Sequence, residues 1–172
     1  MAAPPFSESE LRFLRALRRR KVRFMVVGLS AAALQGAPVV TQDVDLWFED
    51  LGDPGILDAL REVRGAYIPP SRLNPPMFAG GGLELFDIVL TMHGLGTFAE
   101  EVRKCVEVSL GRQKLRVLGM DRILASKRAA NRAKDRLVIP VLEDALAVRE
   151  AAIKRKHGRR TTRGGSSGAR QQ

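Results

Sequence analysis

The sequence is poor in the residues from which several common sites and scaffolds are built. Its 172 residues include one cysteine, Cys105, which excludes an internal disulfide framework and a multi-cysteine zinc site. Its two histidines, His93 and His157, are too far apart in the chain to form a HExxH-type zinc site. With no partner thiol, Cys105 is expected to be a small buried residue in a reducing compartment.

The sequence also lacks an uninterrupted apolar run. Residues 24–42 carry no charge and are nearly numerous enough to span a bilayer. Glycine, proline, serine and glutamine residues divide this stretch into a strand, a short helix and a turn. No basic segment followed by an apolar core marks the N-terminus as a signal peptide. We therefore expect no membrane contact and a cytoplasmic location.

Acidic residues are few compared with basic ones, at 19 against 29, for a net charge of +10. Seven basic residues and no acidic residue lie within 154–172, which leaves 22 basic and 19 acidic residues in 1–153. Because 154–172 contains almost nothing apolar, we expect one domain over 1–153 followed by a basic flexible tail over 154–172. Such a tail would attract RNA or DNA by charge, or would only add solubility.

Hydrophobic patterning predicts helices and strands mixed along one unit. A capping box of Ser7 and Glu10 predicts the start of the first helix. Helices are expected over 8–20, 53–63, 97–104, 120–132 and 135–154, with a short alanine-rich helix ending near Gly36. Strands are expected over 21–27, 41–48 and 83–90, in a hairpin of 106–110 and 114–118, and once within a loop over 65–82. This order predicts an α/β (α+β) domain with a mixed β-sheet flanked by helices.

Three aspartates stand out against these strands. Alternation places Asp43 and Asp45 on one face of a strand, and Asp87 lies in an apolar segment typical of a buried strand. A buried carboxylate costs several kcal/mol unless it is paired or binds a metal. Three carboxylates on neighbouring strands suit Mg²⁺, and two such ions can activate a hydroxyl and stabilise pyrophosphate. The alternative is that Asp43 and Asp45 end a strand and Asp87 pairs with an arginine.

Two further segments carry polar groups suited to phosphate. Gly28 and Ser30 form a turn between a strand and a helix, where backbone N–H groups can bind phosphate and Ser30 can cap the helix or donate to a phosphate oxygen. Lys127, Asn131, Lys134 and Asp135 share one face if their helix is continuous. The lysines would then bind a triphosphate, with Asp135 orienting one of them. The alternative is a solvated helix face.

Taken in order, these motifs resemble the nucleotidyltransferase superfamily, and they are most similar to its minimal AbiEii toxin-like (type IV toxin–antitoxin-like) branch. The resemblance covers roughly residues 20–150. It implies a nucleotidyltransferase-like mixed sheet, and transfer of a nucleoside monophosphate from an NTP to a hydroxyl with two Mg²⁺ ions, or Mn²⁺ in their place. The motifs are Val27–Ser30, Thr41–Leu46, Leu85–Ile88, Lys127–Arg128 and Arg132–Asp135.

The resemblance also implies roles for individual residues. Asp43 and Asp45 would hold the metals and the triphosphate, and Asp87 would bind metal and act as the base toward the acceptor. Ser30 would contact phosphate and Lys127 the nucleotide. The implied partners are an NTP, a hydroxyl acceptor on RNA or protein, and a cognate antitoxin.

The chain departs from the family pattern at one position of the glycine turn. Leu29 follows Gly28 where the family usually has glycine or serine, so Ser30 stands one residue late. This departure motivates a second hypothesis, a non-catalytic module that binds nucleotide or RNA. A third hypothesis is a partner-bound toxin–antitoxin component. The leading hypothesis is a Mg²⁺-dependent nucleotidyltransferase acting on a hydroxyl of tRNA, another RNA, a protein or a small molecule.

Overall fold

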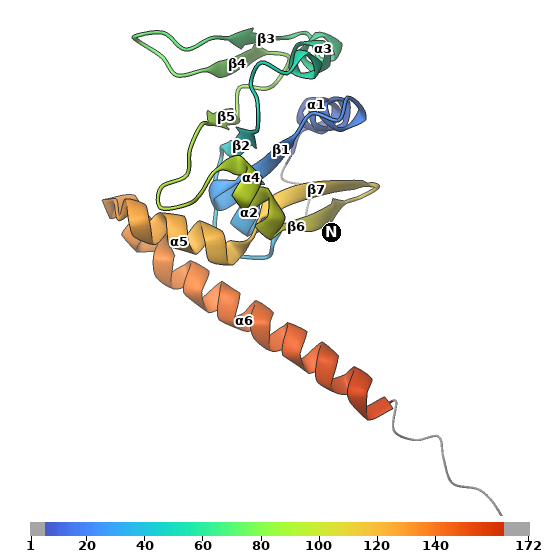
Figure 1. Ribbon diagram of the computed structural model, residues 1–172, viewed down its shortest axis with the longest axis vertical. Coiled ribbons are helices and arrows are strands. Elements are labelled where there is room, and N and C mark those ends of the chain that lie inside the picture. The colour runs from blue at the N-terminus through green and yellow to red at the C-terminus, as the bar shows by residue number, and fades with distance from the viewer. Residues whose placement is uncertain (1–5, 164–172) are drawn as a thin grey trace, which may run out of the picture.

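The computed structural model describes residues 6–163, with side chains described for residues 6–157. One seven-stranded mixed sheet has the order β3-β4-β5-β2-β1-β7-β6, with helices packed around it (Figure 1). The predicted α/β class, with a mixed sheet and flanking helices, is confirmed. The strands are β1 (Phe24–Val27), β2 (Val44–Phe48), β3 (Gly65–Ile68), β4 (Met77–Gly80), β5 (Phe86–Val89), β6 (Cys105–Leu110) and β7 (Gln113–Leu118). The helices are α1 (Glu8–Arg19), α2 (Gly28–Leu34), α3 (Pro54–Glu62), α4 (Phe98–Glu101), the 3₁₀ helix η1 (Val102–Lys104), α5 (Met120–Ala130) and α6 (Ala133–Arg163).

Helix α1 begins at the predicted capping box. The backbone N–H of Glu10 donates to Ser7 Oγ at 3.2 Å, and the backbone N–H of Ser7 donates to Glu10 Oε2 at 2.6 Å. These bonds satisfy backbone donors that the first helical turn leaves without partners. The apolar side of α1 is fully buried, and Phe13 packs on Phe86 of β5 with ring centroids 5.8 Å apart. Helix α1 therefore covers one face of the sheet near β5.

Strand β2 lies between β1 and β5, and its register positions the site. It runs antiparallel to β1 and parallel to β5. Asp45 is paired with Val27 on one side and with Asp87 on the other. Val27, the last residue of β1, thus lies beside Asp45 of β2 and Asp87 of β5 at one end of these central strands.

Two predictions about strands are corrected by the structure. Residues 65–82 contain two strands rather than one, because β3 and β4 pair as an antiparallel hairpin at the edge of the sheet. The apolar segment around Asp87 is not buried throughout: Phe86 is buried, but Asp87 is exposed, and Leu85 and Leu90 are 49% and 57% exposed. An apolar run cannot by itself indicate whether both faces of a strand are covered.

The C-terminal half of the chain forms two helices with a sharp break between them. Asn131 follows α5 with a φ of 47°, and α6 then runs from Ala133 past the end of the sheet (Figure 1). Because α6 continues to Arg163, residues 154–163 of the predicted flexible tail are helical, and the predicted boundary at residue 154 falls inside a helix. Arginine and lysine are good helix formers, and extending a helix is easier than starting one. Residues 164–172 lie outside the described part of the chain.

Two other expectations concern bilayers and thiols. Among the helices of residues 6–163, none combines the length and apolar character needed to cross a bilayer. Cys105, expected to be buried, is only half-buried at the start of β6. Desolvation of the thiol raises its pKa to about 11.

A buried ion pair joins α4 to α5. The Glu101 carboxylate is 1% exposed and accepts hydrogen bonds from Nε and Nη2 of Arg122, both at 2.8 Å. Lys104 Nζ and the backbone N–H of Gly96 also donate to Glu101, at 3.2 and 3.1 Å. The hydrogen bonds from Arg122 lower the pKa of Glu101 to about 2 despite its burial.

We expect Arg122→Ala to lower the free energy of unfolding by about 3 kcal/mol, because it removes the main cationic partner of the buried Glu101 carboxylate. Chemical denaturation at pH 7 measures this change. The matched control is Arg61→Ala, which breaks the exposed Arg61–Asp58 pair and should cost less than about 1 kcal/mol. The folded-state pKa of Glu101 is depressed, so its contribution is complete above the unfolded pKa and is lost as the pH falls toward 2. The difference in free energy of unfolding between the native protein and Arg122→Ala should therefore decrease from pH 5 to pH 2. A difference that stays constant over this range would contradict the depressed pKa of Glu101.

Candidate active site

A cleft of about 590 Å³ opens where the end of β1 and the start of β2 face α5 and α6. Every site residue predicted from the sequence lines it except Ser30. The predicted residues in the cleft are Gly28, Asp43, Asp45, Asp87, Lys127, Lys134 and Asp135. Thr41, His93, Ser126 and Arg132 line it too and were not among the predicted residues. Arg132 had a sequence signal, because it belongs to the Arg132–Asp135 motif.

The three aspartates differ in their surroundings. Asp45 is half-buried within β2, whereas Asp43 precedes the strand and is exposed, as is Asp87. Burial raises the pKa of Asp45 to about 6, the charge of Asp87 adds to this rise, and the charge of Lys127 opposes it. The pKa of Asp87 is also raised, first by desolvation and then by Asp43. The cleft therefore concentrates negative charge that is incompletely neutralised.

Gly28 makes room for the Asp45 carboxylate. Its φ is +65°, in the region that favours glycine. A Cβ at this position would lie 2.0 Å from Asp45 Oδ2, closer than any atom could approach. Gly28 is thus required both by its backbone conformation and by the position of a charged side chain on the adjacent strand.

Ser30 does not line the cleft, and its hydroxyl already has partners. The side chain is 6% exposed; it donates to Val27 O at 2.9 Å and accepts from the backbone N–H of Asp45 at 3.3 Å. A helix turns about 100° per residue, so Ser30, one residue after the usual family position, points to a different side of α2 from Leu29. Leu29 lines the cleft in its place. The Ser30 hydroxyl therefore links β1 to β2 through hydrogen bonds. Its contact with phosphate stays a prediction that this geometry does not favour.

The basic side of the cleft is built across the break between α5 and α6. Asp135 is 1% exposed and accepts from Lys127 Nζ at 3.0 Å and from Arg132 Nε at 2.6 Å. Burial alone would raise the pKa of Asp135, but the hydrogen bonds from Arg132 and Lys127 outweigh it and hold that pKa well below its usual range. Asp135 orients Lys127, as expected. The separate helices predicted over 120–132 and 135–154 are present as α5 and α6, so the two residues meet across the break between these helices and not on the face of one continuous helix.

Lys127 links this cluster to the carboxylates. Its side chain is 17% exposed, and its charge, like that of Lys134, lowers the pKa of Asp45. Lysines on α5 and α6 therefore face Asp45 of β2 across the cleft. Such an arrangement can hold a ligand that carries both phosphate groups and a divalent cation.

The oxygen donors of the cleft suit Mg²⁺ that arrives with a phosphate ligand. In the part of the chain that the structure describes, no group of three or more His, Cys, Asp or Glu side chains forms a ready-made metal cage. Within residues 6–157, Asp43, Asp45 and Asp87 enter no salt bridge either. Mg²⁺ is commonly held by one or two carboxylates together with water and substrate phosphates, rather than by an all-protein cage. Asp45 and Asp87, adjacent in register, fit that requirement.

Trp47 shares the face of Asp45 but belongs to the core. It is 4% exposed and packs edge-on against Phe98, with ring centroids 5.8 Å apart at 88°. It has no exposed surface on which a base could stack.

The fold is similar to that of known structures, although neither family models nor curated proteins match the chain. No family model matches the chain, and no curated protein is significantly similar to it. A crystal structure of ANT(2'')-Ia in complex with adenylyl-2''-tobramycin matches with a TM-score of 0.55 and 14% sequence identity, over 88% of this chain and 95% of that chain. A solution structure of the antibiotic-resistance factor ANT(2'')-Ia matches with a TM-score of 0.50 and 16% identity, over 88% and 96%. The predicted nucleotidyltransferase fold is thereby confirmed; the AbiEii-like branch stays a prediction.

We expect Gly28→Ala to displace the Asp45 carboxylate and to lower the free energy of unfolding by at least about 1 kcal/mol more than Gly111→Ala does. Gly111 is the matched control, because its φ is +59° and a Cβ there would meet nothing within 4 Å. Chemical denaturation of both variants measures the difference. Equal losses would show that backbone strain alone requires Gly28.

We expect Asp45→Asn to raise the free energy of unfolding by about 2 kcal/mol at pH 7.5 without divalent metal. The pKa of Asp45 is raised in the folded state, so the native state binds more protons than the unfolded state between pH 4 and 6, and stability falls as the pH rises through that range. The gain should vanish below pH 4, where the carboxyl is protonated in both states. Denaturation midpoints from pH 3.5 to 8 test this, and an equal gain at every pH would contradict it.

Proposed function

We propose that this protein transfers a nucleoside monophosphate from an NTP to a hydroxyl acceptor, with Mg²⁺ or Mn²⁺ bound beside the triphosphate. The observation that carries the proposal is the register pairing of Asp45 and Asp87 in a cleft whose opposite wall holds Lys127. The fold supports it, because one matching structure of ANT(2'')-Ia contains an adenylyl group joined to tobramycin.

The cleft residues divide into metal-binding and phosphate-binding groups. Bound Mg²⁺ would neutralise triphosphate charge and stabilise the leaving pyrophosphate. Asp43, Asp45 and Asp87 would offer it carboxylate oxygens. Lys127 and Lys134 attract phosphate oxygens from the helical wall, and Asp135 holds Lys127 in place so that less of its rotamer freedom is lost on binding.

The reaction would be an in-line displacement at the α-phosphorus. The acceptor oxygen forms a bond to that phosphorus while the bond to the bridging oxygen breaks and pyrophosphate leaves. Asp87 takes the proton from the acceptor hydroxyl, because it is exposed within the cleft. Its raised pKa makes it a better proton acceptor than an ordinary aspartate near neutral pH.

The charge of the protein bears on the class of acceptor. The net charge of +10 favours an anionic acceptor such as tRNA or another RNA, because long-range attraction concentrates polyanions near the protein. A protein or small-molecule hydroxyl would use the same cleft chemistry. A cognate antitoxin partner stays a prediction from the family resemblance.

One observation favours a second candidate, a module that binds nucleotide without catalysis. Leu29 occupies the cleft at a position where the family has glycine or serine, and Ser30 is committed to the sheet. This candidate predicts NTP binding with no turnover. It also predicts that NTP binding survives Asp45→Asn.

The test is transfer from each α-³²P-labelled NTP with Mg²⁺ to total RNA, total protein and tobramycin in separate reactions. We expect Asp45→Asn and Asp87→Asn each to reduce labelling by at least about 100-fold, a typical loss for a group that acts in the transition state. The matched control is Asp121→Asn, an exposed aspartate on α5 outside the cleft, which should retain labelling.

The pattern of results separates the candidates. Labelling that Asp45→Asn leaves unchanged would overturn the catalytic proposal. NTP binding without labelling of any acceptor, and insensitive to Asp45→Asn, would support the non-catalytic module. The fraction that carries the label identifies the acceptor class.

A further inference from the structure

A second cavity, of about 620 Å³, lies away from the candidate active site. It is formed by the end of α1, the start of β1, η1 and the β6–β7 hairpin. Its polar lining is almost entirely basic, with Glu107 as the only acidic side chain among the described lining residues. We call it the basic groove and define it by six side chains: Arg18, Lys21, Arg23, Arg103, Lys114 and Arg116.

Most of these cations have no acidic partner. Within residues 6–157, Arg23 pairs with Glu49 and Lys114 with Glu107, at 2.8 and 3.4 Å. In the same range, the other four enter no salt bridge: Arg18, Lys21, Arg103 and Arg116. Like charges held close together repel unless an anion binds between them.

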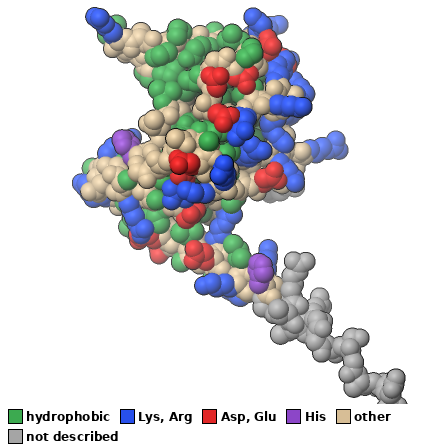
Figure 2. Space-filling model, viewed as in Figure 1, with side chains coloured by type: hydrophobic (Ala, Val, Ile, Leu, Met, Phe, Trp, Pro, Cys, Tyr) green, Lys and Arg blue, Asp and Glu red, His purple; other side chains and the backbone are tan. Residues whose placement is uncertain are grey.

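The end of helix α1 accounts for only part of this charge. Basic residues commonly complement the negative end of a helix, which explains Arg18 and Lys21. Arg103 belongs to η1 and Arg116 to β7, so no helix end explains their approach to the same groove. Figure 2 shows Lys and Arg side chains along the side of the molecule that carries α1 and the β6–β7 hairpin. The tertiary fold has therefore gathered cations from α1, the α1–β1 connection, η1 and β7.

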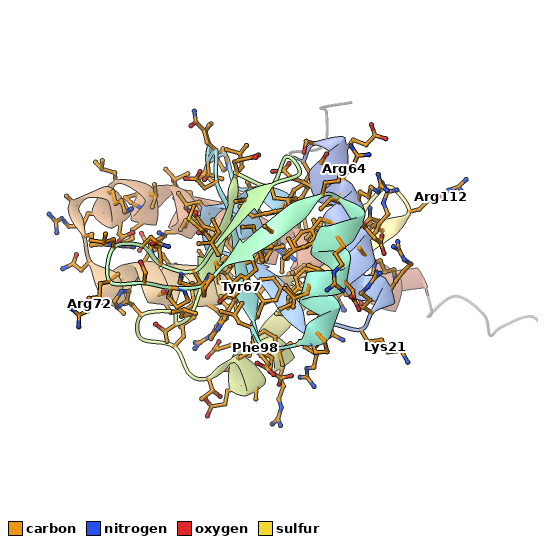
Figure 3. All side chains as sticks on the ribbon, turned by 90° about the horizontal axis from the view of Figure 1, so that it is seen from above. Lys21, Arg64, Tyr67, Arg72, Phe98 and Arg112 are labelled. Carbon is orange, nitrogen blue, oxygen red and sulfur yellow. The ribbon has the colours of Figure 1, made fainter. Side chains whose placement is uncertain are left out.

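The groove is a surface separate from the active-site cleft. The groove includes Phe24 at the start of β1, whereas the cleft includes Val27 at its end, and no residue lines both. Lys21, which follows α1 with a φ of 58°, lines the groove, and its side chain points outward from the molecule (Figure 3). A ligand in the groove can thus be bound while the cleft is free.

We propose that the basic groove binds the phosphodiester backbone of a nucleic acid. Four of its six cations are arginines, which bind phosphate in a bidentate manner and stack on bases. Below these cations the groove is lined by Val22, Phe24 and Leu115, each at most 7% exposed, so the charged side chains supply its accessible surface. A concave groove fits a strand better than it fits a flat membrane surface, and a positively charged groove that follows the backbone is typical of single-strand binding.

This proposal does not depend on the proposed activity, because it concerns another surface. If the acceptor is RNA, the groove would hold its backbone while a hydroxyl enters the cleft. If the cleft has no transferase activity, the groove still binds nucleic acid. Binding to the groove and labelling in the cleft are therefore measured separately.

The test compares two triple variants of the full chain by fluorescence anisotropy with labelled 20-nucleotide RNA. The groove variant carries Arg18→Gln, Arg103→Gln and Arg116→Gln. The control carries Arg12→Gln, Arg15→Gln and Arg64→Gln, which lose the same charge at exposed positions outside the groove. We expect the groove variant to bind RNA at least about tenfold more weakly in 0.1 M salt. Its slope of log affinity against log salt should fall by about 2, since each lost phosphate contact contributes about 0.7.

The controls give each outcome a meaning. Equal weakening by both triple variants would overturn the proposal, because it would show attraction by net charge alone. Loss of binding to poly-glutamate with RNA binding intact would overturn it in favour of an acidic protein partner. Single-stranded DNA of the same sequence distinguishes RNA from DNA as the source of the backbone. Thermal unfolding of each variant establishes that the fold is intact, and NTP binding by the groove variant establishes that the cleft is intact. If the groove variant unfolds, Arg103→Gln alone is compared with Arg12→Gln.

Discussion

The position of one carboxylate, Asp45, constrains much of this structure. It is held in a central strand, half-buried, beside Asp87 of β5 and against the Cα of Gly28. Its own backbone N–H is bound by Ser30, so the turn after β1 fixes the strand that carries the acid. Burial and a like charge both oppose ionisation of Asp45, and the folded protein is less stable for it. Such a carboxylate is retained where a bound cation or a proton transfer makes use of it.

On the opposite wall of the cleft, the buried Asp135 carboxylate restricts the position of the Lys127 side chain. A lysine near several aspartates would be free to adopt many rotamers, and some would place it away from the cleft. Asp135 limits that freedom, because it is buried at the helix break and binds both Lys127 and Arg132. The break at Asn131 therefore both changes the helix direction and brings the Asp135 carboxylate to Lys127. It lets residues eight positions apart meet although they belong to different helices.

The charge of the protein is distributed in three parts with different consequences. The cleft combines aspartates with lysines, which suits a metal–triphosphate complex. The groove gathers six cations, four of which enter no salt bridge within residues 6–157, and this suits a phosphodiester backbone. The basic residues beyond 153 continue along α6 at least to Arg163. Figure 2 also shows apolar side chains over the β3–β4 end of the molecule, away from α1 and the β6–β7 hairpin.

Local pattern determined the elements, the capping box of α1, the α3 start at Asp53 and Pro54, the hairpin of β6 and β7, and the set of polar residues around the cleft. These features depend on spacing along the chain, which the sequence records directly. Only the tertiary structure decided that Ser30 faces the sheet, that Asp87 is exposed, that 65–82 forms a hairpin, and that Lys127 and Asp135 meet across a helix break. It also decided that cations from α1, the α1–β1 connection, η1 and β7 converge on one groove, although the balance of +3 in residues 1–153 gave no sign of it. Net charge and hydrophobic periodicity can be read directly along the chain. The burial of a side chain and the approach of cations from different elements depend on which distant segments pack together.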